Sequence, residues 1–351
     1  MVAFRSGLVR EILDERRGLQ KVAVDLAGEV SRAYVLTGLI GDVAVGDAVV
    51  CNTTAVDLDL GTGGWHFVHW NLARSEFVAP GPGHIMKLRF TSLQADVGST
   101  EEHEPALAAT VDCAGLVVVA AGLHSQIAGI AAGVRDRASG ARIAYVMTDG
   151  GALPLVLSDL VHNLVDRNLI DVTITCGHAF GGDREAVSLA SALAVARHVE
   201  HADVAIVAMG PGIVGTGTAL GTSGLELATI LDTAGALGAR AIATIRVSHA
   251  DTRDRHRGVS HHSLTALGLA GRRSTIAVPR GAATLIAELE SNRIGERHDV
   301  IETDIPDVVA QFETLGLRVT SMGRSANDDR ALHECAAAAG VLAAASGPFA
   351  P

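Results

Sequence analysis

The sequence predicts an α/β protein with a doubly wound, mostly parallel sheet, preceded by a small all-β domain that is either a barrel or a sandwich. From about residue 114 onward, nearly continuous apolar runs of strand length alternate with helix-like stretches, as expected when both faces of a parallel sheet are covered. Before that point, short apolar stretches are separated by turns such as Gly41-Asp42 and Gly46-Asp47, a pattern typical of small β domains. We therefore expect a β-rich domain with its linker over residues 1–112 and an α/β domain over 113–351.

In the first domain, the expected strands are residues 21–24, 32–36, 48–51 and 66–68. The stretch Pro80-Gly81-Pro82-Gly83 cannot continue a strand, because proline lacks the N–H group that a ladder requires, so it is expected to be a connector. Residues 95–112 are polar and acidic and form the expected link to the next domain.

In the second domain, strands and helices are expected to alternate. The expected strands are residues 116–119, 143–147, 172–175, 204–207, 241–245, 276–278 and 300–301. The expected helices are residues 125–138, 155–168, 183–200, 223–237, 283–290, 306–314 and 330–345.

Composition narrows the class of protein. With 351 residues, 48% of them hydrophobic and 19% charged, the chain is expected to be a soluble globular protein. A formal net charge of -11 and only 3% aromatic residues argue against nucleic acid as a partner, since binding to a phosphate backbone needs a basic surface.

The same composition argues for a cytoplasmic protein. The longest apolar runs, 114–123 and 335–345, are too short to cross a bilayer, so no membrane partner is expected. The start of the chain does not resemble a signal peptide. Four scattered cysteines without a C-x-x-C pair are expected to be free thiols in a reducing compartment: Cys51, Cys113, Cys176 and Cys335. The sequence leaves open whether the chain forms a homo-oligomer.

Polar and glycine-rich segments directly follow five of the expected strands. Because parallel strands send their carboxyl ends to one edge of a sheet, these segments are expected to converge there. They are residues 122–125 with His124, 148–151 with Asp149, 176–185, 210–218 and 248–262.

The segment 176–185 admits two interpretations. Gly181 and Gly182 would let backbone N–H groups approach a ligand at a helix N-terminus, with His178 beside them. Alternatively, Asp183 is the N-cap of a helix that begins there, and Glu185 complements the helix dipole.

The segment 210–218 has the glycine spacing of a dinucleotide-binding fingerprint and follows a strand. A helix does not open at once, however, and no lysine follows the last glycine, so neither standard nucleotide-binding loop is supported. We expect an anion-binding loop formed by backbone N–H groups and hydroxyls, the alternative being a flexible turn of small residues. Its expected ligand-binding residues are Gly210, Gly212, Gly215, Thr216 and Thr218.

The segment 246–263 holds four histidines within fourteen residues, 249 to 262, and leaves three interpretations open. His249, Asp251 and His256 could bind a metal together with His261 or His262, although the spacing matches no standard zinc motif. In the interpretation that we favour, no metal is needed: arginines, Arg253 and Arg255 among them, bind a phosphate or carboxylate while a histidine beside Asp251 transfers protons. In the third, Ser260 simply caps a helix.

A nucleophilic triad is not visible. The chain has no G-x-S-x-G motif, and Cys176 is expected to be a small buried residue.

Three long motifs together resemble a bacterial family of unknown function, DUF3866. They are Gly-His-Ala-Phe-Gly-Gly-Asp-Arg-Glu-Ala-Val at 177–187, Gly-Pro-Gly-Ile-Val-Gly-Thr-Gly-Thr at 210–218, and Ser-His-Ala-Asp with Arg-His-Arg-Gly-Val-Ser-His-His within 248–262. The resemblance covers nearly the whole chain but implies no reaction and no catalytic residues.

The residues themselves suggest an enzyme, a hydrolase or group transferase that acts on a small anionic metabolite, phosphorylated or nucleotide-like. The alternatives are a ligand-sensing or scaffold protein without turnover and a metal-dependent hydrolase. The expected catalytic residues are His178, His249, Asp251 and His256. The expected ligand-binding residues are His124, Asp149, Gly181, Gly182, Asp183, Gly210, Gly212, Gly215, Thr216, Thr218, Arg253, Arg255, His261 and His262. The sequence does not identify a cofactor.

Overall fold

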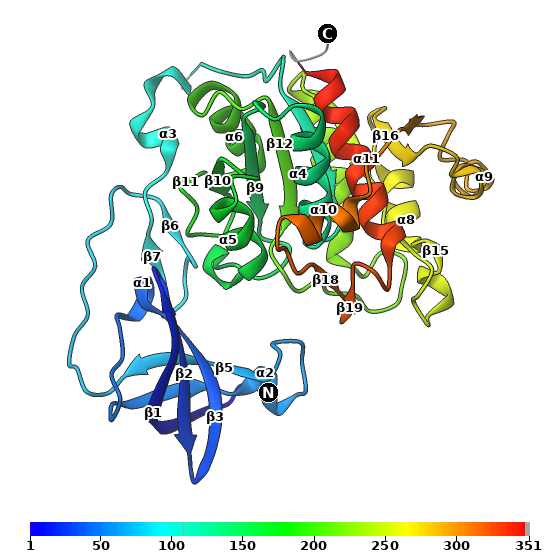
Figure 1. The fold of residues 1–351 in the computed structure, drawn as a ribbon. Helices are drawn as coiled ribbons and strands as arrows, with labels where there is room; N and C mark the ends of the chain where they lie inside the picture. The colour runs from blue at the N-terminus through cyan, green and yellow to red at the C-terminus, as the bar shows by residue number, and fades with distance from the viewer. Residues whose placement is uncertain (108, 348–351) are drawn as a thin grey trace. The chain divides into compact units, whose positions relative to one another are not determined.

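The computed structural model describes residues 1–107 and 109–347 and divides them into two compact units, one over Met1–Asp96 and one from Val97 onward. The first unit contains a closed barrel and the second an eight-stranded parallel sheet with helices (Figure 1), so the predicted fold class is confirmed. Residues 97–107, expected in the link, cluster with the second unit, where the Thr100 hydroxyl donates a hydrogen bond to the carbonyl of Glu185 at 2.8 Å.

The barrel has the strand order β1-β2-β3-β5-β4. Its strands are β1 (Phe4–Arg16), β2 (Leu19–Leu26), β3 (Glu29–Leu36), β4 (Ala48–Asn52) and β5 (Trp65–Asn71). The long strand β1 pairs with both β2 and β4, and two register shifts let it bend around the closing barrel. The sequence analysis missed β1 because most of its side chains are polar or exposed, and only Val9 is fully buried.

Valines fill the barrel, including Val22, Val24, Val35 and Val49. Three of the expected strands lie within β2, β3 and β4, and the fourth lies within β5. The remaining elements of this unit are short: α1 (Thr37–Ile40), α2 (Thr54–Asp57), β6 (Met86–Lys87) and β7 (Ala95–Asp96).

The second unit is organised around a sheet of strand order β11-β10-β9-β12-β8-β13-β16-β17, in which every neighbouring pair is parallel. The strands are β8 (Val117–Ala121), β9 (Ile143–Thr148), β10 (Val172–Thr175), β11 (Arg184–Glu185), β12 (Val204–Met209), β13 (Arg240–Thr244), β16 (Thr275–Pro279) and β17 (Asp299–Thr303). Every residue of the central strands β8, β9 and β12 is buried, which explains their continuous apolar sequences.

Helices cover both faces of this sheet. One core packs under α4 (Gln126–Arg137), α5 (Asp159–Asp166), α10 (Val308–Thr314) and α11 (Arg330–Ser346). The other packs under α6 (Leu189–Ala194), α7 (Glu226–Ala236), α8 (His261–Leu269) and α9 (Ala283–Ser291). The smaller elements include α3 (Thr100–His103), the hairpin of β14 (Val247–Ser248) and β15 (Gly258–Val259), and the hairpin of β18 (Thr320–Ser321) and β19 (Arg324–Ser325). A π-helix, η3 (Val195–Val199), continues α6. The single 3-10 turns are η1 (Pro105–Leu107), η2 (Leu155–Leu157), η4 (Ser223–Leu225) and η5 (Asp254–His256).

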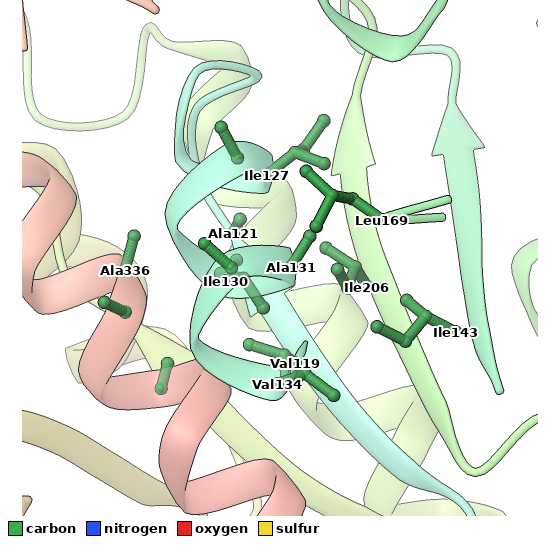
Figure 2. Packing of buried hydrophobic residues seen from close by; sticks show 14 of the residues in the cluster. Val119, Ala121, Ile127, Ile130, Ala131, Val134, Ile143, Leu169, Ile206 and Ala336 are labelled. Carbon is green, nitrogen blue, oxygen red and sulfur yellow. The ribbon is translucent and has the colours of Figure 1, made fainter. Parts of the chain in front are cut away.

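Helices α4 and α11 pack against each other through small residues (Figure 2). A Cβ atom added to Gly133 would lie 2.4 Å from the carbonyl oxygen of Ala337, and one added to Gly340 would lie 2.1 Å from that of Ile130. Glycine is therefore needed at both positions for the two backbones to approach. Within the described residues, no helix has the length and hydropathy needed to cross a bilayer.

Candidate functional site

The carboxyl edge of the sheet collects the five polar segments that follow β8, β9, β10, β12 and β13. Because all these strands are parallel, each segment leaves the sheet at the same edge. Strands β10 and β13 lie four positions apart in the strand order, however, so the segments at 176–185 and 248–262 are separated along that edge. The contacts between neighbouring segments show how the edge is built.

Asp149 holds the loop after β10. Its carboxylate accepts a hydrogen bond from the backbone N–H of His178 at 2.9 Å. A Cβ atom on Gly177, whose φ is 64°, would lie 2.3 Å from the same carboxylate. Glycine at this position therefore lets the loop close onto Asp149, and the role of the carboxylate seen here is to fix backbone.

Asp183 holds the edge strand rather than a helix. Its carboxylate accepts hydrogen bonds from the backbone N–H and the hydroxyl of Thr173 at 2.9 and 2.8 Å. Residues Arg184–Glu185 then form β11, and α6 begins only at Leu189, with Ser188 as the N-cap. The predicted helix start at Asp183 is therefore wrong, because its carboxylate is used by the neighbouring strand.

The glycine N–H groups beside Asp183 also have partners within the protein. Gly181 donates to the Glu185 carboxylate at 2.7 Å, and Gly182 donates to the Thr175 hydroxyl at 3.2 Å. The expectation that these donors bind a ligand stays a prediction, and it requires that a ligand displace these contacts.

His124 links the loop after β8 to the end of β12 and to the start of α5. One ring nitrogen, Nδ1, lies 3.0 Å from the carbonyl oxygen of Met209, and the other, Nε2, lies 2.7 Å from the hydroxyl of Ser158. Burial lowers the pKa of His124 to about 4. We infer that Nδ1 donates to the carbonyl and that Nε2 accepts the Ser158 proton, so this neutral imidazole positions the loops around it.

Glu226 is a polar residue at this edge that the sequence analysis missed. It is the first residue of α7, and its Oε2 atom is buried without a hydrogen-bond partner in the described part of the chain. Burial raises the pKa of this carboxyl group, and the nearby Asp149 charge raises it further, against the opposing effect of Thr148. An acidic residue in a first helical turn is common, so nothing in the sequence distinguished it.

The loop after β12 folds onto itself. The backbone N–H of Thr216 donates to the carbonyl of Gly221 at 2.7 Å, and the Thr218 hydroxyl accepts from the N–H of Gly221 at 3.1 Å. The hydroxyls of Thr216 and Thr218 lie 2.9 Å apart. Left-handed φ values of 97° and 82° at Gly212 and Gly217 allow these turns. Gly210 lets the start of the loop pass the neighbouring chain, since a Cβ atom there would lie 2.2 Å from the carbonyl oxygen of Ala152.

The tip of this loop lies beside the histidine-rich segment after β13. A Cβ atom on Gly215 would lie 3.5 Å from the His262 ring, and one on Gly217 would lie 3.8 Å from the Arg255 guanidinium. The structure thus brings together two segments that are adjacent in neither the sequence nor the strand order.

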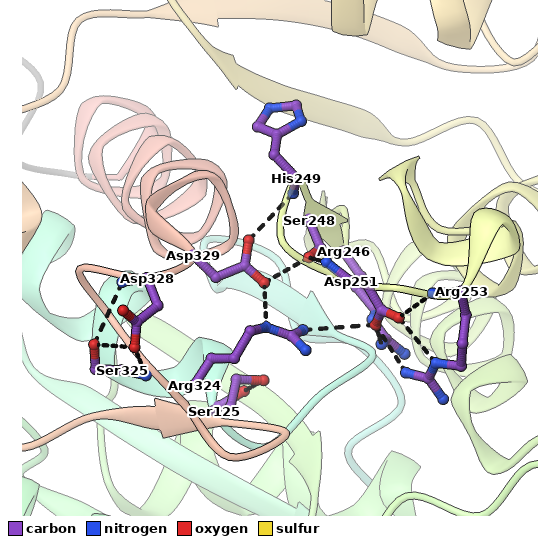
Figure 3. A network of polar contacts seen from close by, with 11 residues as sticks. Ser125, Arg246, Ser248, His249, Asp251, Arg253, Arg324, Ser325, Asp328 and Asp329 are labelled. Atoms are coloured by element: carbon purple, nitrogen blue, oxygen red, sulfur yellow. Dashed lines mark hydrogen bonds and ion pairs between the residues drawn. The ribbon is translucent and has the colours of Figure 1, made fainter.

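Asp251 is the centre of a buried ion-pair network (Figure 3). Its side chain is 2% exposed and accepts hydrogen bonds from Arg253 at 2.8 and 2.9 Å and from Arg246 at 3.2 Å, while the Arg324 guanidinium lies 3.5 Å away. Hydrogen bonding to Arg253, opposed by burial and assisted by the other charges, holds the pKa of Asp251 well below its usual range. Such a carboxylate remains ionised and is a poor proton acceptor.

Asp329, which directly precedes α11, extends the network. It accepts a hydrogen bond from the Ser248 hydroxyl at 2.5 Å, from Arg324 at 3.1 Å and from the backbone N–H of His249 at 3.3 Å. The His249 ring is exposed and points away from the carboxylates in Figure 3. The structure therefore places the His249 side chain apart from Asp251.

Three imidazoles form a compact group, which we call the histidine cluster: His256, His261 and His262. Their ring centroids lie 4.2 to 5.0 Å apart. Burial, together with nearby arginines, lowers the pKa of His256 to about 3, and burial with the neighbouring His261 and arginines lowers that of His262 to about 4. These rings are neutral at physiological pH, and each offers a nitrogen lone pair.

The cluster differs from the metal group expected from the sequence. Within the described residues, the one set of side chains with potential metal-binding atoms in mutual reach is the histidine cluster, whose nitrogens lie within 4.8 Å of one another. Of the predicted group, His256 belongs to it, as do His261 and His262, the alternative fourth ligands, whereas His249 and Asp251 do not. Ser260 is the N-cap of α8, as predicted, and its hydroxyl also lies 2.8 Å from Nδ1 of His256.

Comparison with known protein families gives a match over most of the chain. The model of a family described as a protein of unknown function, DUF3866, matches residues 32–340. The match covers most of the chain and both units. No curated protein matches the sequence.

Proposed function

The chain belongs to DUF3866, a family without an assigned activity, and we propose from its site that it is an enzyme, a hydrolase or group transferase, acting on a small anionic metabolite. The substrate would bind at the carboxyl edge of the sheet, between the loop at 210–221 and the segment at 246–262. The observation that carries this proposal is the position of Arg255 beside Gly217 and near the histidine cluster.

Arg255 is a cation available to an anionic substrate beside the glycine-rich loop. It is exposed and, within the described residues, it has no ion-pair partner. Arg246 and Arg253 instead both bind Asp251, which compensates one of their two positive charges. A guanidinium group next to a glycine-rich loop can bind a phosphate or carboxylate through paired hydrogen bonds.

The neighbouring imidazoles favour chemistry over simple binding. A neutral imidazole nitrogen can accept a proton or bind a metal ion, and both roles serve hydrolysis or group transfer. The three rings are held in place by α8 and by the Ser260 hydroxyl, so they are preorganised next to Arg255. A ligand-sensing protein would need Arg255 to bind an anion, but it would not need the histidine cluster.

The first test is anion binding by the full chain, with inorganic pyrophosphate as the probe. We expect pyrophosphate at about 100 times its Kd to stabilise the protein by about 2.7 kcal/mol in thermal unfolding. Arg255→Ala should raise the Kd about tenfold, because it removes a charge-assisted contact worth about 1.5 kcal/mol.

The matched control is Arg240→Ala. Arg240 is also exposed, but it lies at the start of β13 and hence at the opposite edge of the sheet. The Arg240→Ala substitution removes the same charge as Arg255→Ala, but far from the proposed site. The affinity for pyrophosphate should therefore stay within about twofold of that of the unmodified protein. Equal losses of affinity in the two variants would contradict the proposed site.

Turnover distinguishes the enzyme from the sensor. The protein is incubated with p-nitrophenyl phosphate and with nucleoside triphosphates, and the release of phosphate or nitrophenolate is followed. We expect turnover that Arg255→Ala reduces and Arg240→Ala does not. Stabilisation by these anions without any turnover would favour a ligand-sensing role.

A further inference from the structure

We infer that the histidine cluster, His256, His261 and His262, is a binding site for a divalent transition-metal ion such as Zn²⁺. Imidazole nitrogens suit zinc, copper, iron and nickel, whereas magnesium and calcium require oxygen ligands. Three protein ligands are also the number found in catalytic zinc sites, in which the fourth position is left for water or substrate.

The distances are close to those of a metal site. The ligand nitrogens of the three rings lie within 4.8 Å of one another. Nitrogens bound to one tetrahedral zinc ion at about 2.1 Å lie about 3.4 Å apart, so the rings need to approach by at most about 1.4 Å. Small rotations of the imidazoles about their side-chain bonds achieve such a shift without moving the backbone.

The second observation is that several nitrogens of the cluster have no partner. Nε2 of His261 and both ring nitrogens of His262 are buried without a hydrogen bond in the described part of the chain. A buried polar atom that loses its hydrogen bond to water costs the folded state about 1 to 3 kcal/mol. A metal ion at the centre of the cluster would bind Nε2 of His261 and one of the two ring nitrogens of His262.

The ring of His256, the third member of the cluster, is also oriented to bind a metal ion. Nδ1 of His256 lies 2.8 Å from the Ser260 hydroxyl, which can accept a hydrogen bond from Nδ1–H and so leave Nε2 with a free lone pair. Metal-binding histidines commonly donate their second N–H to such a partner, which fixes the tautomer and the ring orientation. Ser260 also accepts a hydrogen bond from the N–H of His262 at 3.3 Å, so one residue positions two of the ligands.

Local sequence explains why the three ligands can meet. His256 ends the turn η5, and His261 and His262 are the first residues of α8, whose start is fixed by the Ser260 cap. The strand pairing of β14 with β15 joins the two ends of the intervening segment, with Val247 opposite Val259. The metal site is thus formed by one short stretch of chain whose ends are hydrogen-bonded to each other through β14 and β15.

The charges around the cluster fit a metal that works with an anion. Arg246 and Arg253 oppose a cation, but both are paired with Asp251, which compensates one of their two positive charges. Arg255 and the bound metal would then attract an anionic ligand together. The catalytic use of a metal-bound water rests on the proposed function, whereas binding of the metal does not.

The test begins with metal binding to the full chain. Protein freed of metal with a chelator is titrated with ZnCl₂ by calorimetry, and in parallel with CoCl₂, whose visible absorption reports tetrahedral nitrogen coordination. We expect one zinc ion per chain and a tetrahedral cobalt spectrum that zinc abolishes. Absence of both signals would overturn the inference, and because the unmodified protein is used, a folding defect cannot explain that result.

Variants then locate the site. His261 is the least buried ligand, so His261→Ala should preserve the fold, as checked by thermal unfolding without metal, and should weaken zinc binding by more than about a hundredfold. His249→Ala is the matched control, because His249 lies in the same segment with its ring exposed and outside the cluster. Equal zinc affinity in the two variants would refute the assignment of the site.

The metal site and the proposed substrate site can fail separately. If zinc does not bind but Arg255→Ala still weakens pyrophosphate binding, the metal inference falls and the anion site stands. If zinc binds through His261 but pyrophosphate is unaffected by Arg255→Ala, the metal site stands and the proposed function falls.

Discussion

At the scale of single residues, Asp251 and the histidine cluster have opposite electrostatic environments although they lie in one segment. Asp251 is surrounded by three guanidinium groups and stays ionised. The imidazoles of His256 and His262 are buried and stay neutral. The first environment suits a fixed structural charge, and the second suits lone-pair donors. The role of Asp251 that follows is to hold Arg246 and Arg253 in place.

A substitution at Asp251 tests this role. Asp251→Asn keeps the shape of the side chain but leaves Arg246, which is 6% exposed, without its counter-charge. We expect the free energy of unfolding in urea at neutral pH to fall by about 3 kcal/mol, as when one partner of a buried pair is removed. Asp254→Asn, an exposed neighbour, should change it by less than about 0.5 kcal/mol. A similar small change in both variants would show that the network does not stabilise the fold.

His333 predicts a dependence of stability on pH. It is fully buried in α11, neither ring nitrogen has a hydrogen-bond partner within the described residues, and burial lowers its pKa to about 4. The unfolded chain has the ordinary pKa, about 6.5, so it binds more protons than the folded state between these values. The contribution of His333 is therefore constant above pH 6.5 or so, and stability falls as the pH drops toward 4.

The size of this effect is about 2 kcal/mol at pH 5 for His333 alone. The measurement is urea unfolding at pH 7.5 and at pH 5.0. His333→Leu should reduce the difference between the two pH values by about that amount. His162→Leu, which replaces an exposed histidine on α5, should keep the pH response of the unmodified protein. An unchanged response in His333→Leu would mean that the ring is protonated or solvated in the folded state.

At the scale of elements, the close packing of α4 on α11 decides which residues fit where the two helices touch. The glycines at the contact have a helix propensity about 1 kcal/mol poorer than alanine, yet no side chain fits there. The geometry of the contact therefore outweighs propensity, and these two helices carry one face of the core.

Gly133→Ala and Gly268→Ala should have opposite effects. At Gly133 the new methyl group would lie 2.4 Å from a carbonyl oxygen of α11, so the helices must separate, and we expect a loss of about 2 kcal/mol in thermal or urea unfolding. Gly268 lies within α8 with no atom within 4 Å of the added methyl group. There we expect a gain of about 0.5 to 1 kcal/mol from helix propensity. Stabilisation in both variants would contradict the close packing.

Element by element, the sequence predicted the strands that are buried on both faces, but it missed the long, mostly exposed β1 and the two-residue strand β11. The apolar runs at 143–147, 172–175 and 204–207 lie within β9, β10 and β12, because strands buried on both faces need continuous apolar sequence. Strand β11 has two residues, Arg184 and Glu185, and is held by side-chain contacts of Asp183 with Thr173. Such contacts depend on tertiary structure, so the same residues looked like the start of a helix.

For the candidate site, the sequence indicated which segments gather but not which atoms meet. The order of strands brings loops to one edge, and this follows from alternating strands and helices. The partners of Asp251 include Arg324, which is far away in the sequence, and Glu226 is close to Asp149 only through the strand order. Histidine spacing alone could not separate His249 from the cluster, because the separation depends on how the chain turns between β14 and β15.

At the scale of the whole molecule, the candidate site belongs to the second unit alone. The sheet, both of its cores and all five polar segments lie after Val97. The barrel has its own core and shares none of these residues. The family match extends over both units, since it begins at residue 32 within β3.

The position of Asp329 has a consequence for biosynthesis. The carboxylate that anchors Ser248 and His249 comes from the residue before α11, well over sixty positions after the histidine cluster in the chain. A nascent polypeptide emerging from the ribosome therefore exposes Arg246 and its neighbours before Asp329 has been made. Until that point Ser248 and His249 lack this acceptor, so the segment can reach its final structure only after nearly the whole α/β unit has been synthesised.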